Sequence, residues 1–239
     1  MRESGRRGKA PAETYGMQTL GAYVRSALPA TPRSFDHSNR VNSYPMALNS
    51  HVDNSPLAAA IHFNQMAHAM AGEVFQYPGD DAMLDLCNAF EVEDGNLSIF
   101  EVLESWMVDG IFGTRLIGFV PLDINNRKEM SSACNAFGGV ILGLDMPFSA
   151  EEQFDENEPW RLPMEDYEEG PGHAVLMTGA NVFGIDVITW GTTQSMTWGF
   201  WEAYGREAWV AIPEILVEAN HAPCWSIDLN RLVVDLENL

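Results

Sequence analysis

The chain has 239 residues, with 13 lysines and arginines against 34 aspartates and glutamates, and a formal net charge of −21. Hydrophobic residues make up 46% of the chain, enough for a continuous core, and this excludes disorder throughout. The acidic balance excludes a general nucleic-acid binder, because contacts to phosphates are made mainly by lysine and arginine.

Hydropathy and cysteine spacing exclude further classes. No apolar run approaches the roughly 20 residues that cross a bilayer, and no apolar block typical of a signal peptide follows the basic start. We therefore expect no membrane-spanning segment and no secretory signal. Three widely spaced cysteines offer no CxxC metal pair, so we expect no metal ion, no cofactor and a structural role for Cys87, Cys134 and Cys224.

The first 42 residues differ from the rest in charge. Residues 1–40 hold seven basic and three acidic residues, whereas the remainder holds six basic and 31 acidic ones. One apolar cluster fits a short amphipathic helix, at Met17, Leu20, Tyr23 and Val24. We predict an N-terminal arm over 1–42, either a disordered tail or a segment that orders on a partner through its basic side chains, Arg2, Arg6, Arg7, Lys9, Arg25 and Arg33.

The next stretch, about 43–112, has the pattern of helices. The segment Asn54-Ser55-Pro56-Leu57 offers an N-cap candidate and a proline at the first helical position, and strong helix formers follow, which predicts a helix that runs to about Ala71 and is stopped by Gly72. A second helix is predicted over 81–90. A third is predicted over 98–110, because Ser98 and Glu101 form a capping box.

From about 113 to 239 the pattern changes to short apolar or β-branched runs bounded by Gly, Pro or charge. These runs predict strands at 116–120, 140–144, 174–178, 186–190 and 208–212, with helices near 126–137 and 228–236. Either Ser226 or Asp228 is the expected N-cap of the last helix. A helical subdomain followed by an antiparallel sheet or barrel is an α+β fold. The acidic stretch 151–169 predicts a solvated loop, and most tryptophans of this half are expected in the core.

Two runs in the second half resemble a known family. Residues 170–179 read GPGHAVLMTG, and residues 185–193 read IDVITWGTT. A histidine that opens an apolar strand after a glycine turn, followed by a strand that ends in Trp-Gly-Thr, resembles the second half of papain-like cysteine peptidases. The stretch 48–60 and the run 196–204 look like a subgroup of that family from bacteriophages and actinobacteria. The resemblance covers about residues 45–239 and implies a papain-like fold.

Carried over residue by residue, the resemblance implies a changed catalytic set. His173 is retained at the position of the catalytic histidine. Ser55, at the start of the first long helix, stands where the family has its nucleophilic cysteine. His51 stands in place of the glutamine of the oxyanion hole, and Ile188 in place of the asparagine that orients the histidine. Serine is a far weaker acid than cysteine and needs an oriented general base.

From these departures we expect a pseudo-peptidase with no catalytic residues, and thus not an enzyme. The resemblance and the charge asymmetry together favour a structural or binding protein of a bacteriophage virion, assembled in the host cytoplasm and docked on capsid or tail subunits through the basic arm. Two alternatives stay open at this point. One is a weak serine-type peptidase or amidase that uses Ser55 and His173, and the other is an adaptor that holds a peptide in the empty cleft.

Overall fold

The structure, a computed structural model, describes residues 15–90, 97–163 and 169–239. Its centre is a 7-stranded antiparallel sheet with the strand order β2-β7-β3-β4-β5-β6, to which β1 adds by pairing with β4. The strands are β1 (Phe35–Asp36), β2 (Leu116–Pro121), β3 (Val140–Pro147), β4 (Glu169–Ala180), β5 (Gly184–Thr189), β6 (Thr192–Thr197) and β7 (Gly205–Pro213).

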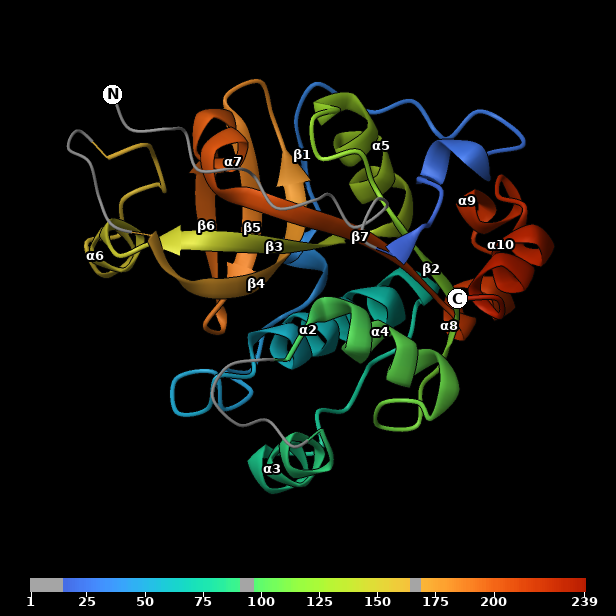
Figure 1. Ribbon diagram of the computed structural model, residues 1–239, viewed down its shortest axis with the longest axis horizontal. Coiled ribbons are helices and arrows are strands. Elements are labelled where there is room, and N and C mark those ends of the chain that lie inside the picture. The colour runs from blue at the N-terminus through green and yellow to red at the C-terminus, as the bar shows by residue number, and fades with distance from the viewer. Residues whose placement is uncertain (1–14, 91–96, 164–168) are drawn as a thin grey trace.

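Helices cover the sheet on both sides. In Figure 1, α2 and α4 lie on one side of β3 and β7, and α5 and α7 lie on the other. The helices are α2 (Ser55–Ala71), α3 (Asp80–Ala89), α4 (Ile99–Val108), α5 (Arg127–Phe137), α6 (Ser149–Asp155), α7 (Trp198–Tyr204), α8 (Glu214–Glu218), α9 (Ala222–Trp225) and α10 (Leu229–Leu236), with single 3-10 turns at Leu20–Ala22 and Ser38–Arg40.

The predicted helix ends are set by the caps that the sequence suggested. Gly72 closes α2 in the left-handed conformation, with φ of 81°. Ser98 and Glu101 form the complete capping box of α4, and the Asp228 side chain caps α10 by accepting from the Arg231 N–H. The predicted elements of the second half are all present, and β6 and α7 are additional elements that the sequence pattern did not indicate.

The acidic stretch 151–169 corrects one expectation, since its first part belongs to helix α6 and is not a loop. Trp160 fixes this region to the domain. Its indole is fully buried and donates from Nε1 to the Ala150 carbonyl at 2.9 Å, and its backbone pairs with β6. Charged residues therefore cover the outer side of a segment whose anchor is apolar.

The described part of the arm packs against its own domain. Leu20 and Tyr23 are buried, and the Tyr23 hydroxyl donates to Asp235 at 2.9 Å. Arg25 forms an ion pair with Asp228 of the same chain, whereas we expected it to contact a partner. Arg33 is exposed. The other four predicted contact residues, Arg2, Arg6, Arg7 and Lys9, lie outside the described residues.

Across residues 15–90, 97–163 and 169–239, no helix is long and apolar enough to cross a membrane. The hydrophobic core is continuous between the helices and the sheet. Four of its largest fully buried side chains are tryptophans, namely Trp106, Trp160, Trp201 and Trp209. Of the six tryptophans in the second half of the chain, four are buried as expected, Trp160, Trp198, Trp201 and Trp209, whereas Trp225 is 60% exposed.

Candidate active site

Ser55 is the first residue of α2 and is held in place by the residue before it. Asn54 is fully buried, and its Nδ2 donates to the Ala47 carbonyl at 2.9 Å and to Cys87 Sγ at 3.3 Å. Its Oδ1 accepts from Asn49 Nδ2 at 3.1 Å. Asn54 thus fixes the loop that enters α2, although its side chain makes no cap bond to the helix. The loop is thereby bonded to itself and to Cys87 of α3, and this fixes the position of Ser55.

The Ser55 hydroxyl joins the helical half to the sheet. Its Oγ accepts a hydrogen bond from the Ala174 N–H at 3.0 Å, across 119 residues of sequence. Ser55 is only 3% exposed, so this bond forms away from bulk water. An N–H donor at Oγ stabilises negative charge that develops there, and it leaves the hydroxyl hydrogen available for another acceptor.

His173 lies next to that contact on β4, and Thr189 fixes its ring. His173 Nε2 and Thr189 Oγ1 are 2.8 Å apart, and Thr189 is 2% exposed. The tautomer that acts as a base carries its hydrogen on Nε2, donates it to Thr189 and keeps a lone pair on Nδ1. We expected His173 to lack an orienting partner, because Ile188 replaces the asparagine of the family. Thr189, the next residue along the strand, supplies one.

Trp190 holds the other face of the imidazole. Its ring stacks on His173 with centroids 4.8 Å apart and an interplanar angle of 29°. Trp190 and Gly191 join β5 to β6 as a two-residue turn, and both have positive φ, 45° and 74°. This is the backbone of a tight hairpin turn, which glycine accepts readily and tryptophan rarely adopts. The strained turn places the indole against the histidine.

Burial determines the charge of His173. Loss of solvation lowers its pKa from 6.5 to about 4, because the imidazolium is the form that burial penalises. The ring is therefore neutral at pH 7 and able to accept a proton. Its low proton affinity also makes it a weak base, since general bases work best with a pKa near the operating pH.

Two cavities meet at this site. The cavity of Ser55, about 130 Å³, is bounded by α2, by the start of α4 and by β3, β4 and β7. The second cavity, about 300 Å³, lies between the loop 49–53 and the residues around Phe148 and Trp190. His173, Gly172 and Asp53 line both. An extended ligand that crosses His173 can therefore occupy the two cavities at once.

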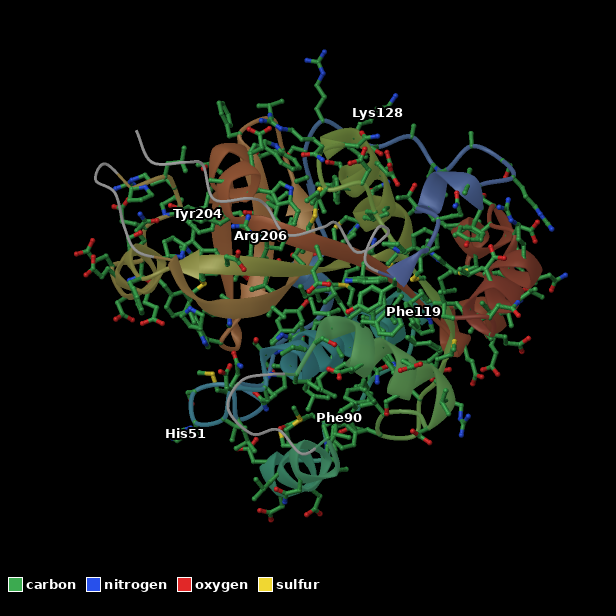
Figure 2. The ribbon with its side chains drawn as sticks, viewed as in Figure 1. His51, Phe90, Phe119, Lys128, Tyr204 and Arg206 are labelled. Atoms are coloured by element: carbon green, nitrogen blue, oxygen red, sulfur yellow. The ribbon has the colours of Figure 1, made fainter. Side chains whose placement is uncertain are left out.

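His51 does not lie beside Ser55. It is exposed, its Nδ1 is 2.7 Å from Ser50 Oγ, and it lines only the second cavity. Figure 2 shows it on the outer side of its loop. A backbone donor for the oxyanion is the N–H of Ser55 itself. Because Ser55 is the first residue of α2, this N–H has no acceptor within the helix. A helix N-terminus also favours negative charge.

Ile188 is fully buried in β5 and takes no part in the site. Sequence reasoning missed Thr189 because it compared only position 188 with the orienting asparagine of the family. The side chain that contacts His173 lies one residue further along the strand. A neighbouring hydroxyl within Ile-Thr-Trp-Gly was the available signal. Asn49 was also missed. Its amide lines the second cavity and supports Asn54, and nothing in its local pattern distinguishes it.

The cysteines are buried and free, and burial raises the pKa of each thiol, for Cys224 to about 11. They are not thiolates at neutral pH. Within the described residues, no three His, Cys, Asp or Glu side chains gather as a metal ion would require. The chemistry available at this site is therefore that of Ser55 and His173.

One of the comparisons with known proteins bears on the fold. No family model matches the chain, and no curated protein matches it. Among solved structures it is similar to the crystal structure of xylellain, a cysteine protease from Xylella fastidiosa. The TM-score is 0.61, the alignment covers 80% of this chain and 91% of that chain, and the sequence identity is 9%. The chain has a papain-like α+β fold. At this identity the likeness shows the fold alone.

This finding also corrects one expectation. We predicted from the changed catalytic set that the chain is not an enzyme, and that prediction is contradicted by a structural neighbour that is a cysteine protease. One of its two physical premises fails as well. That premise was the loss of an orienting partner at position 188, yet the hydroxyl of Thr189 lies 2.8 Å from His173 Nε2.

Proposed function

We propose that this protein is a serine-type hydrolase of amide or peptide bonds, with Ser55 as nucleophile, His173 as general base and Thr189 as positioning residue. One observation carries the proposal. Ser55 and an imidazole held by Thr189 line the same cavity, and the Ser55 oxygen accepts an N–H bond from the residue after that histidine. Nucleophile, base and orienting group are the three parts that acyl transfer needs.

The reaction follows from these groups. Ser55 Oγ attacks the carbonyl carbon of the amide while its proton passes to His173 Nδ1. The negative charge on the carbonyl oxygen is stabilised by the Ser55 N–H at the helix N-terminus. The carbon–nitrogen bond then breaks as His173 returns the proton to the leaving amine. Water attacks the resulting ester by the same route in reverse and releases the acid.

The site supports a slow enzyme. His51 lies outside the cavity of Ser55, so the oxyanion lacks the side-chain donor that the family resemblance led us to look for. The absence of one such donor costs roughly 2.7–4 kcal/mol of transition-state stabilisation. The low proton affinity of His173 reduces the rate further. Acylation of Ser55 by a reactive trap is therefore easier to detect than turnover of a peptide.

The test is intact-mass analysis after exposure to a fluorophosphonate. We expect one adduct, localised to Ser55 by peptide mapping and lost in both Ser55→Ala and His173→Ala. His68→Ala is the matched control, because His68 lies at the far end of the same helix, where its ring hydrogen-bonds to the Asn64 carbonyl and contacts Phe75. No adduct on the folded protein, or an adduct that persists without His173, would overturn the proposal.

The virion role is a separate prediction that none of the comparisons bears on. It is supported by the runs at 48–60 and 196–204 that look like the bacteriophage and actinobacterial subgroup, and by the basic start of an acidic chain. Stoichiometric copurification with assembled particles, lost on deletion of residues 1–14, would support it. Full incorporation of the deleted protein would remove the role given to the basic residues.

A further inference from the structure

Glu207 forms part of the wall of the Ser55 cavity. It lies on β7 directly opposite Gly143 of β3. A side chain at Gly143 would collide with it, since an added Cβ would lie 2.5 Å from Glu207 Cγ and 2.9 Å from Oε1. The glutamate therefore folds flat over the glycine, across the face of the sheet. Glu207 can adopt this position only because Gly143 has no side chain.

The carboxylate is fixed and has no cationic partner. Glu207 Oε2 accepts from Trp209 Nε1 at 2.6 Å. The neighbouring cation, Arg206, is engaged with Asp145 instead. Among residues 15–90, 97–163 and 169–239, no ion pair to Glu207 is present. Burial and the nearby Asp145 raise the pKa of Glu207, so a bound cation would relieve an unfavourable charge.

The same cavity also has an apolar part to its lining. Pro56 and Ile99 line it from the starts of α2 and α4, and Leu97 lines it from just before the N-cap of α4. A long basic side chain suits such a space, because its methylene groups pack on apolar surface while its charged end reaches a carboxylate. With Asp53 and Asp145 also in the lining against one Arg206, the cavity carries net negative charge.

We propose that the Ser55 cavity binds a lysine or arginine side chain of the substrate, next to the bond that is cleaved, and that Glu207 is the specificity-determining residue. The binding selects a substrate only if the protein is the hydrolase proposed above, so this part of the inference rests on the proposed function. The binding itself does not need catalysis, so it is measured on a protein that lacks the nucleophile.

The experiment uses Ser55→Ala and a positional peptide library in which each position in turn is lysine or norleucine. Bound peptides are separated by equilibrium dialysis and quantified by mass spectrometry. We expect one position at which lysine is enriched about tenfold over norleucine. The enrichment disappears in Ser55→Ala/Glu207→Gln and persists in Ser55→Ala/Glu218→Gln, which makes the same charge change at an exposed site on α8.

A second contrast leaves Glu207 unchanged, in case its substitution prevents folding. Peptides with arginine at the selected position are compared with peptides that carry the neutral isostere citrulline. Equal binding of the two, absence of any lysine preference, or a preference that survives Glu207→Gln would each overturn the inference. A protein that shows the preference but forms no fluorophosphonate adduct on Ser55 would keep this binding site and refute the hydrolase.

Discussion

Two histidines of this protein, one buried and one half-buried, have the same low pKa in different surroundings. Burial lowers the pKa of both His62 and His173 to about 4. His62 lies inside α2, is 2% exposed, and its Nε2 is 2.8 Å from the Pro45 carbonyl. His173 lines two cavities and contacts a hydroxyl and an indole.

The difference teaches that a perturbed pKa does not by itself mark a catalytic group. Both rings are neutral at pH 7 for the same reason, loss of solvation. Only His173 combines that state with a cavity, a nucleophile on the same cavity and a hydroxyl partner that holds its ring in place. His62 Nδ1 is buried without a partner among the described residues, a position from which it can reach no substrate.

The largest expected effect separates the two histidines by function. His173→Ala should lower the rate of Ser55 labelling about 10²–10³-fold, because a general base contributes that much to proton transfer. His62→Ala should leave the rate close to that of the unchanged protein and lower the free energy of unfolding by about 2 kcal/mol, since it empties a core position. Labelling kinetics and urea unfolding on both variants measure this. Equal loss of labelling in the two would mean that His173 acts only through the fold.

The next prediction concerns pH. Each histidine has a folded pKa of about 4 and an unfolded value near 6.5, so the unfolded chain binds more protons between these limits. The stability they contribute is complete above pH 6.5 and is lost as the pH falls towards 4. For His62 the change is on the order of 3 kcal/mol.

Urea unfolding at several pH values checks this, and His62→Gln should flatten the slope between pH 4 and 6.5. Labelling of Ser55 should fall on the acid side with a midpoint near 4, where His173 becomes protonated. A midpoint near 6.5 would show that the catalytic imidazole is solvated, and it would remove the distinction in surroundings on which the comparison rests.

More of the fold than of the candidate site could be predicted from the sequence. Capping residues and glycine stops determine helix ends locally, so Ser98, Gly72 and Asp228 were readable without tertiary information. The strand β6, Thr-Thr-Gln-Ser-Met-Thr, lacked an apolar run because only Gln194 and Met196 of it are buried. The place of Glu207 depends on contacts across the sheet, which no local pattern encodes, whereas Thr189 lies one residue beyond the position that was compared.

A smaller effect is expected at Thr189. Thr189→Val keeps the shape of the side chain and removes the hydroxyl, so His173 loses the hydrogen-bond partner that orients its ring. We expect labelling of Ser55 to slow about tenfold, the equivalent of one buried hydrogen bond. Thr189→Ser should restore the rate. A purely structural role would predict a loss of stability that parallels the loss of rate, and would not predict rescue by serine.

The smallest expected effect concerns the bond that joins the two halves of the site. Ser55→Ala leaves the Ala174 N–H without its acceptor, and an unsatisfied buried donor costs roughly 1–3 kcal/mol. Ser55→Cys keeps an acceptor, although a weak one, and should lose less stability than alanine. It also installs a stronger nucleophile at a helix N-terminus. If Ser55→Cys reacts with iodoacetamide faster than buried Cys87 and only while His173 is present, the imidazole activates whatever nucleophile stands at position 55. If it reacts no faster than Cys87, His173 does not activate a nucleophile at position 55. His173 would then differ from His62 in its surroundings but not in its chemistry.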